Sequence, residues 1–345
     1  MEMITARCIR GSSKIALAPS AKFMARAAME WERRIGRRLR LRDLHILSTV
    51  VQRGSMAKAA AHLAVSQPAV SDAIANLEVA LGVRLLDRGP HGVAPTIYAE
   101  ALLKRGDVVF DELKQGISDI EFLTNPNVGE IRVGCPESLA FISSAIIDRL
   151  SRRYPDVVVR IVTAQPATLE FRELRQRKVD LLLGRISPPL MDDDVDVEIL
   201  FKDQLFVVAG SRNRWTRRQK IDLAELMGER WLLLPANNVL SSLIAQAFQG
   251  RGLDPPRECV SADVHTRLHL LTTGRFLTFL PNSLLQFVAK RWSLKALPVD
   301  LSIQAPALGI ITLRNRTVSP VVHLFIEAAR EVAKSLAGRP RGRKS

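Results

Sequence analysis

The apolar positions of the chain follow a helical period from Leu41 onward. The first periodic segment runs to about Val51, and Gly54 is placed to end it. An alanine-rich second segment follows over Met56–Leu63, with Ser55 at the position of its N-cap. The pattern therefore predicts two short helices joined by a tight turn.

A third helix is predicted directly after this pair. Val65 is expected to turn inward, Ser66 to cap the helix, and Pro68 to lie in its first turn, where the missing N–H does no harm. Gly82 marks its end. Its buried stripe recurs at helical spacing: Val70, Ile74, Leu77 and Leu81. Two short helices with a third packed beneath them predict a helix-turn-helix unit.

Two further elements follow this unit. Residues 85–94 form two short extended stretches around a Gly/Pro turn, which is typical of a small β-hairpin wing. Pro95 and Thr96 then begin a long helix that runs to about Phe122. Its apolar track is spaced for pairing with another helix: Leu102, Val109, Leu113, Ile117 and Ile120. Gly106 and Gly116 weaken this helix-pairing surface, so a dimer formed through this helix is expected to need further contacts.

The pattern changes after the turn-rich segment Asn125–Gly129. Short apolar runs there alternate with amphipathic segments. The predicted strands are Ile131–Gly134, Val157–Val162, Asp180–Gly184, Leu205–Ala209, Trp231–Leu234 and Cys259–Ser261. The predicted helices are Leu139–Tyr154, Thr168–Arg177, Leu223–Met227 and Ser241–Arg251. This alternation predicts a parallel α/β sheet in two lobes.

We therefore predict a multi-domain α and α/β protein. The expected parts are a flexible basic extension (1–40), the winged helix-turn-helix (41–95), a linker helix (96–124), a two-lobed domain (125–335) and a basic disordered tail (336–345). Lobe one is expected over about 128–190 and 280–335, and lobe two over about 191–279.

Charge and cysteine content narrow the class of protein. The chain has 345 residues and a net charge of +15, which suggests a polyanionic partner, although a protein with a merely basic surface would show the same excess. Residues 1–125 hold 18 Lys and Arg against 13 Asp and Glu, so most of the excess lies outside the helix-turn-helix. Cys8, Cys135 and Cys259 are scattered, which favours a reducing compartment and excludes a structural zinc site.

No apolar run is long enough to span a bilayer, so no membrane partner is expected. The N-terminal stretch is interrupted by polar and charged residues and makes a poor signal peptide. A cytoplasmic protein is expected. The basic extension has one functional alternative, which is to follow a DNA backbone.

Several motifs in fixed order carry a resemblance to a known family. They are Gly54-Ser-Met-Ala-Lys-Ala-Ala60, Leu63-Ala-Val-Ser-Gln-Pro-Ala-Val-Ser71, Ile74-Ala-Asn-Leu-Glu78 and Leu81-Gly-Val-Arg-Leu-Leu86. Together they resemble the signature of LysR-type transcriptional regulators. The resemblance covers about residues 40–335 and is strongest over 41–105. Within that family, the Gly-Pro-His-Gly wing and Pro95-Thr96 are similar to the galactose-binding-protein-regulator subgroup.

This resemblance implies a function and partners. It implies a sequence-specific regulator that binds a dyad in promoter DNA as a homodimer or homotetramer. It also implies a domain like those of periplasmic solute-binding proteins, in which two lobes close on a small-molecule effector. RNA polymerase is a further conceivable partner.

Helix three carries the residues expected to read DNA. If its apolar stripe faces inward, Gln67, Ser71 and Asp72 face outward. Gln can bind the adenine edge through two hydrogen bonds, and Asp can accept one from cytosine. Asp72 departs from the basic or amide residue expected at this position, and Pro90 and His91 replace arginines expected in the wing. The full set of expected DNA contacts is Ser55, Lys58, Ser66, Gln67, Pro68, Ser71, Asp72, Arg84, Arg88 and His91. Ser66 has the alternative role of a helix cap only, and Lys58, Arg84 and Arg88 are expected on phosphates.

Effector contacts are expected just after the strands, because open α/β sheets bind ligands beyond the carboxyl ends of their strands. The candidates are Ser138, Pro166, Ala167, Thr168, Arg185, Asn237, Asn238, Ser241, His265 and Thr266. Helix N-termini, one Arg and two Asn favour a small polar or carboxylate-bearing effector. The alternatives are that the Ser and Thr residues only cap helices and that Arg185 pairs with Asp203.

Other classes of function find less support. The chain has no P-loop, GxSxG, HExxH or GxGxxG motif, so we expect no enzyme and no cofactor. His265 and His269 stand four residues apart, but no neighbouring acid is expected to complete a metal site with them. A DNA-binding protein without a regulatory role and a solute-binding receptor are the remaining alternatives.

Overall fold

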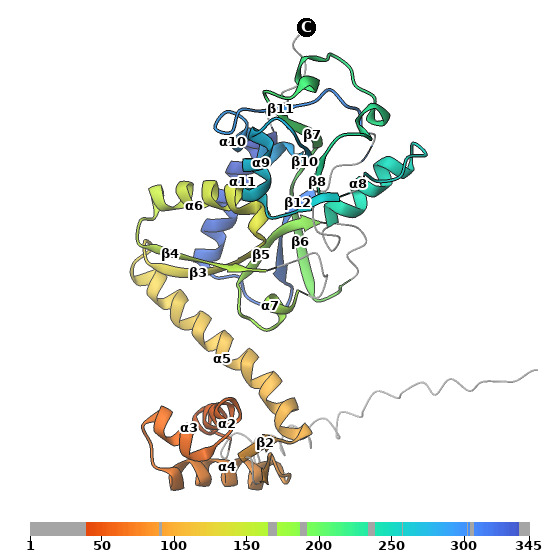
Figure 1. Cartoon of the computed structure of the whole chain (residues 1–345). Coiled ribbons are helices and arrows are strands. Elements are labelled where there is room, and N and C mark those ends of the chain that lie inside the picture. Colours follow the sequence, from red (N-terminus) through yellow and green to blue (C-terminus); the bar gives the residue numbers. More distant parts are fainter. Residues whose placement is uncertain are drawn as a thin grey trace, which may run out of the picture. The chain divides into compact units, whose positions relative to one another are not determined.

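The computed structural model describes residues 39–89, 92–164, 171–186, 192–233, 239–256, 258–301, 303 and 307–337. The chain forms two compact units, residues 1–107 and 108–345. The boundary between the two units lies inside one long helix. The sequence suggested instead that the two-lobed domain begins after this helix, at residue 125. Each unit is described separately below (Figure 1).

The described part of the first unit contains three helices, a two-stranded hairpin and the start of a fourth helix. These elements are α2 (Leu41–Arg53), α3 (Met56–Leu63), α4 (Gln67–Leu81), β1 (Leu86–Gly89), β2 (Gly92–Pro95) and α5 (Ile97–Thr124). The predicted stripe on α4 forms the centre of its core, since Val70, Ile74 and Leu77 are almost completely buried. Gly54 and Gly82 both adopt left-handed conformations that end α2 and α4, as their positions predicted.

Two local expectations in this unit are wrong. Ser55 occupies the N-cap of α3 in an extended conformation, but its side chain makes no capping hydrogen bond. Val65 is exposed rather than inward, because Ala64 takes a left-handed conformation at the end of α3. Ser66 does cap α4, through an Ala69 N–H donated to its Oγ at 3.4 Å.

The second unit contains two five-stranded sheets, which define its two lobes. Its first half comprises β3 (Gly129–Cys135), η1 (Glu137–Leu139), α6 (Ala140–Arg153), β4 (Val157–Thr163), α7 (Arg172–Arg175), β5 (Leu181–Ile186), β6 (Val195–Lys202), β7 (Leu205–Gly210), η3 (Arg214–Arg217) and η4 (Leu223–Leu226). Its second half comprises β8 (Trp231–Leu233), α8 (Val239–Gln249), β9 (Glu258–Ser261), α9 (Val264–Thr272), β10 (Leu277–Pro281), α10 (Asn282–Val288), β11 (Leu294–Ala296), β12 (Ala307–Leu313) and α11 (Pro320–Ala337).

Lobe one is built on the sheet with strand order β4-β3-β5-β12-β6. Strands β4, β3 and β5 are parallel, whereas β12 runs antiparallel to both β5 and β6. Helices α6 and α11 bury their apolar faces on one side of this sheet, and α7 packs on the other. The prediction of an all-parallel sheet is therefore wrong at β12, because the chain returns to this lobe from lobe two.

Lobe two is built on the sheet with strand order β11-β7-β10-β8-β9. Strands β10, β8 and β9 are parallel, and β7 runs antiparallel to β10 and β11. Trp231, Phe248 and Phe279 form the centre of its core, with the rings of Trp231 and Phe279 stacked 4.8 Å apart. Helices α9 and α10 cover the opposite face.

The lobe boundaries differ from the predicted ones at both crossings. Strand β6 pairs with β12 and so belongs to lobe one, whereas β10, α10 and β11 belong to lobe two. The expected helix over residues 168–177 is reduced, within the described residues, to the four residues of α7 between Phe171 and Gln176. Residues 165–170 and the predicted basic extension and tail, apart from 39–40 and 336–337, lie outside the described residues.

Candidate functional site

The first turns of α4 present the predicted reading residues on an anchored helix. Gln67, Pro68 and Asp72 are exposed and Ser71 is half-buried, while Val70 is completely buried between them. Because the buried stripe fixes the rotation of α4, these four side chains share the outward side of its first two turns. The structure thus brings the expected base-reading residues together.

The wing is attached closely to the helices. The Val93 N–H donates to the Gly54 carbonyl at 3.0 Å, and the Thr96 hydroxyl donates to the Arg84 carbonyl at 2.8 Å. Glu78 of α4 accepts a 2.7 Å hydrogen bond from the Leu85 N–H, which positions the first strand of the hairpin. These bonds fix where the hairpin leaves the helical core.

The predicted phosphate contacts are distributed around this unit. Lys58 on α3 and Arg84 before β1 are exposed, and Ser55 is half-buried. The side chain of Arg88 and the whole of His91 lie outside the described residues.

Candidate effector residues from the two lobes meet at one place in the second unit. Glu137 and Ser138 follow β3 in lobe one, and His265 and Thr266 follow β9 in lobe two. The His265 Nδ1 lies 3.9 Å from a Glu137 carboxylate oxygen. The ring of Phe141, on the first turn of α6, lies 6.0 Å from the His265 ring. The rule about strand ends selects the segments that hold Ser138 and His265, but the residues that contact His265 are Glu137 and Phe141, which it does not name.

Two acids do lie beside His265, although His269 is not part of their group. Glu137, Asp263 and His265 each offer a ligand atom, and these three atoms lie within 4.8 Å of one another. All three residues are exposed, and Asp263 already accepts hydrogen bonds from the His265 N–H, the Thr266 N–H and the Thr266 hydroxyl as the N-cap of α9. The hydrogen bonds from Thr266 hold the pKa of Asp263 below its usual value. The roles of Asp263 and Thr266 here are those of a helix cap.

Arg185 takes the alternative role that the sequence left open. Its NH2 group lies 3.0 Å from the carboxylate of Asp203, which also accepts hydrogen bonds from the backbone N–H and the hydroxyl of Ser283. Asp203 stands where the chain first crosses from lobe one to lobe two, so these bonds tie β5 to the start of α10. The second guanidinium nitrogen, Arg185 NH1, is buried without a hydrogen-bond partner among the described residues.

The remaining effector candidates are not brought into this group. Ser241 is half-buried on α8. Pro166, Ala167, Thr168, Asn237 and Asn238 lie outside the described residues.

Comparison with known proteins assigns both units. A family model described as the LysR substrate binding domain matches residues 124–334, and one described as a bacterial regulatory helix-turn-helix protein of the lysR family matches residues 41–100. The chain belongs to the LysR family. It is therefore a DNA-binding transcriptional regulator with an effector-binding domain, not an enzyme, and its partners are DNA and a small-molecule effector.

Individual relatives and structures agree with LysR membership. The chain is 26% identical over 289 residues to the HTH-type transcriptional regulator TdcA of Escherichia coli K12, which covers 84% of this chain and 91% of that protein. It is 25% identical over 296 residues to GbpR of Azospirillum brasilense, covering 85% and 86%. Its fold is similar to that of a full-length OxyR variant from Pseudomonas aeruginosa, with a TM-score of 0.59 at 21% identity over 86% of this chain and 98% of that one.

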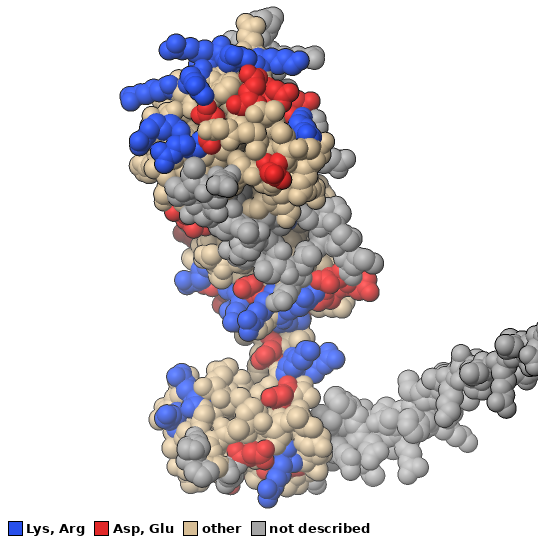
Figure 2. Space-filling view, turned by 45° about the vertical axis from the view of Figure 1, so that its right-hand side comes forward, with Lys and Arg blue, Asp and Glu red and all other residues tan. Residues whose placement is uncertain are grey.

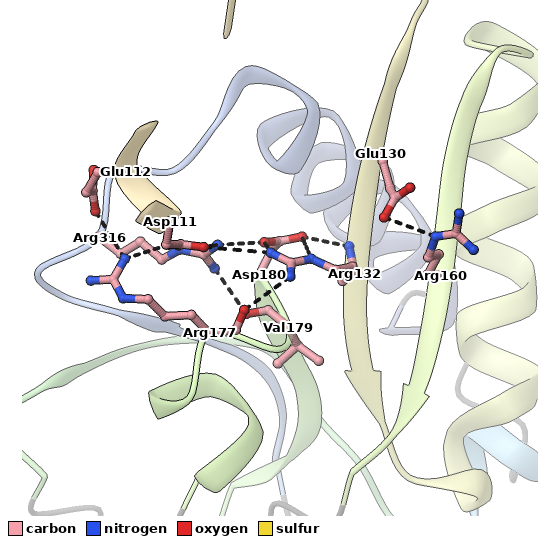
Figure 3. Close-up of polar contacts among 9 residues, drawn as sticks. All are labelled: Asp111, Glu112, Glu130, Arg132, Arg160, Arg177, Val179, Asp180 and Arg316. Atoms are coloured by element: carbon pink, nitrogen blue, oxygen red, sulfur yellow. Dashed lines mark hydrogen bonds and ion pairs between the residues drawn. The ribbon is translucent and has the colours of Figure 1, made fainter. Parts of the chain in front are cut away.

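In this LysR regulator, the second half of α5 is bound to the effector-binding domain by a buried charge network (Figure 3). Arg316 donates from Nε and NH2 to the two oxygens of Asp111 at 2.8 and 2.9 Å, and from NH2 to Asp180 at 2.8 Å. Arg177 donates to the same Asp111 carboxylate at 2.6 Å. Asp111 and Arg316 are less than 10% exposed, so this network is largely shielded from water.

Asp180 links this network to the sheet of lobe one. Its carboxylate accepts hydrogen bonds from the backbone N–H of Arg132 at 2.7 Å and from the Arg132 guanidinium at 2.8 Å. Burial by itself would raise the pKa of Asp180, but the hydrogen bonds from Arg132 outweigh it and hold this pKa below its usual value. The members of this network are separated by up to 205 positions and form no local motif, so no pattern along the chain predicts it.

Proposed function

We propose that this LysR-family protein reads a dyad operator through Gln67, Ser71 and Asp72, and that binding of a small polar or carboxylate-bearing effector between its two lobes changes its output at the promoter. The observation that carries the DNA half is the anchored α4, which buries Val70 and exposes its first turn. Ser66 and Pro68 then act at the start of that helix, where free N–H groups also attract phosphate.

Contacts with DNA phosphates position the helix-turn-helix on the duplex without reading the base sequence. Lys58 and Arg84 are exposed beside the reading helix and suit this role. We include Ser55, Arg88 and His91 in the same set on the strength of their positions in the sequence.

Dimerisation through α5 is part of this proposal. Its apolar track is exposed in the single chain, with Val109, Leu113, Ile117 and Ile120 each more than 40% exposed at spacings of four, four and three residues. Such a stripe is spaced for pairing with a second helix, which would place two reading helices on successive half-sites. A homodimer that assembles further into a homotetramer fits this arrangement, with RNA polymerase as a further partner at the promoter.

The effector half rests on the meeting of the segments after β3 and β9 from opposite lobes, where His265 lies 3.9 Å from Glu137, the residue before Ser138. Closure of the lobes on a ligand would shift the equilibrium between two arrangements by the difference in its affinity for them. Glu137 lies at the same place and favours effectors with a hydroxyl or amino group there. Ser241 completes the proposed set together with Pro166, Ala167, Thr168, Asn237 and Asn238, which lie outside the described residues. Arg185 and Thr266 are left out of it, because they are engaged with Asp203 and Asp263.

We place the protein in the cytoplasm, where an operator is accessible. Among the helices that the structure describes, none has the length and apolar character needed to cross a bilayer.

Gel-shift titration on the DNA upstream of the protein's own gene tests the DNA half. Replacing a residue with a bidentate base contact should cost about 1–3 kcal/mol in discrimination between operator and random DNA, and we expect that loss for Gln67→Ala. Asn76→Ala is the matched control, because Asn76 is exposed on α4 beyond the first two turns that hold the proposed reading residues. Equal discrimination by wild type and Gln67→Ala would remove Gln67 from the reading set, and a wild-type protein without any preference would refute the proposal.

Thermal unfolding of the full chain with sugars, sugar acids and aromatic acids, one compound at a time, tests the effector half. A compound at 100 times its Kd should stabilise the protein by about 2.7 kcal/mol, and Ser138→Ala should reduce that shift. Ser151→Ala, at the other end of α6, should leave it unchanged. If no compound in these classes raised the unfolding temperature, the assignment of the effector class would be wrong.

A further inference from the structure

One end of the lobe-two sheet gathers basic side chains that the DNA-binding unit does not explain. The strand pairing places Gly210, Trp231, Leu277 and Leu294 side by side at this end. Exposed cations stand within a few residues of each of these positions. They are Arg212, Arg230, Arg275, Lys290, Arg291 and Lys295, which we call the basic end of lobe two.

Backbone contacts hold these segments together. The Ser211 N–H donates to the Ser293 carbonyl at 2.8 Å, which joins the loop after β7 to the turn before β11. The Asn213 side chain donates to the Gly274 carbonyl at 2.9 Å, which joins the same loop to the turn before β10. Cations that are far apart in the sequence are therefore neighbours on one surface. Figure 2 shows Lys and Arg side chains gathered at the top of the view, where Figure 1 places β11 and β7.

The cations of the basic end are not neutralised by nearby acids. Within the described residues, none of the six side chains forms an ion pair or a side-chain hydrogen bond. The neighbouring acids are already engaged, since Glu229 pairs with Arg214 and Glu225 with Arg218. A surface with unpaired cations costs free energy through self-repulsion, which an anionic partner relieves.

Two of these cations are held in place by an aromatic ring. The guanidinium groups of Arg230 and Arg275 lie 5.1 and 5.7 Å from the centre of the Phe276 ring, which is itself buried. Cation–π contacts of this kind reduce the freedom of the side chains before any partner binds. The basic end is thus partly preorganised.

The basic end is distinct from the interlobe position of the effector candidates. Strands β8 and β9 run parallel from Trp231 and Glu258 to Leu233 and Ser261, and His265 follows the latter end. Arg230 precedes β8, so the basic end lies at the opposite end of these strands. An anionic effector bound beside His265 would leave the basic end unoccupied.

We propose that the basic end of lobe two binds the phosphate backbone of double-stranded DNA that flanks the operator, as a second DNA contact formed by the effector-binding domain. DNA is the favoured polyanion because the helix-turn-helix of the same protein already holds it at high local concentration. The contact is independent of base sequence, because Arg and Lys on phosphates position a complex without reading bases. It also gives a role to part of the excess of basic residues outside the first 125. The inference rests on the DNA-binding function and adds a second surface to it.

Salt titration of full-chain binding tests this contact. Each phosphate contact adds about 0.9 to the slope of log affinity against log salt, so Arg212→Gln/Arg275→Gln/Arg291→Gln should lower that slope by about 2 to 3. The loss should appear on a promoter duplex of about 150 base pairs, one persistence length, which extends well beyond the operator. A duplex limited to the operator should show wild-type affinity and slope.

A matched control carries the same change of charge on lobe one. Arg172→Gln/Lys178→Gln/Lys202→Gln removes three exposed cations that have no ion pair within the described residues. It should keep the wild-type slope on both duplexes. A second variant of the basic end, Arg230→Gln/Lys290→Gln, should lower the slope on the long duplex by about 2 and so guards against a folding defect in the first.

Three outcomes would overturn the proposal. The first is a wild-type slope for both basic-end variants on the long duplex, and the second is an equal loss in the lobe-one control. The third is unchanged DNA binding together with lost binding of poly-L-glutamate, which would assign the surface to an acidic protein. The effect of Gln67→Ala on specific binding to the short duplex tests only the proposed reading of the operator. A failure of that proposal can therefore be distinguished from a failure of the proposed contact at the basic end.

Discussion

Arg316 and Asp111, which are 205 positions apart in the sequence, form an ion pair with two hydrogen bonds of 2.8 and 2.9 Å. Asp111 lies on α5, and Arg316 follows β12 of the effector-binding domain. Because both side chains are buried, the second half of α5 is an integral part of that domain. Lobe one and the second half of α5 therefore belong to one packed unit.

Breaking this pair should destabilise the effector-binding domain. Asp111→Ala leaves Arg316 and Arg177 as buried cations with fewer partners, and removing one partner of a buried pair typically costs about 3–5 kcal/mol. Urea unfolding followed by fluorescence measures the free energy of unfolding. Arg160→Gln is the control, because Arg160 pairs with Glu130 on the surface and such pairs contribute at most about 1 kcal/mol. A loss no larger than the control's would show that Asp111 is not structurally important.

Asp180 should make the stability of the same domain depend on pH. Its pKa is lowered in the folded protein, so its contribution is fully present above the pKa of about 3.9 that the unfolded chain shows. That contribution is lost as the pH falls from there through the lowered folded pKa. Asp180→Asn should therefore be less stable than wild type at neutral pH and should show a shallower loss of stability under acid conditions. Parallel acid-unfolding profiles for the two proteins would contradict this role.

Gly92 should tolerate no side chain. It has a φ of 117°, and a Cβ at this position would lie 2.5 Å from the Gly54 carbonyl oxygen. Gly92→Ala should thus displace the hairpin from α2 and cost about 1–3 kcal/mol or more through backbone strain and the clash. Gly89→Ala, in the paired strand, meets nothing within 4 Å and should be nearly neutral. Thermal unfolding of both variants compares them, and equal losses would mean that the strain at Gly92 is relieved elsewhere.

The Cys135 thiol should be unreactive in the folded protein. Burial raises its pKa to about 12, so very little thiolate is present at neutral pH. Iodoacetamide at pH 8 followed by peptide mapping should leave Cys135 unmodified until guanidinium is added. Rapid labelling of this residue in the native state would show that the loop after β3 opens.

The helices of the DNA-binding unit could be predicted because their signals are local. The cap Ser66, the stops Gly54 and Gly82 and the stripe on α4 all act within a few residues of the element that they define. The order of strands in the effector-binding domain carries no such local signal. Strand β6 mixes apolar and charged residues and is not among the predicted strands, and only its pairing with β12 assigns it to lobe one.

The candidate site was predicted in part for the same reason. The rule about strand ends selected the segments after β3 and β9, which meet through Glu137 and His265, because it depends on topology that the alternation of elements reveals. The same rule made Arg185 an effector candidate and left its pairing with Asp203 only as an alternative. The structure shows that pairing. The network around Asp111 depends on contacts between α5, β3, β5 and the segment after β12, and no pattern of residue types along the chain predicts it.

The buried position of Asp111 sets a rule for exchanging parts between related regulators. A hybrid protein joined at Asn125, the turn that the sequence marks as a hinge, would place a foreign helix against Arg316, Arg177 and Asp180. A hybrid joined before Val108 keeps the acid together with the arginines that surround it. The fusion point for combining one regulator's DNA-binding unit with another's effector-binding domain therefore lies in the middle of α5, one turn ahead of Asp111.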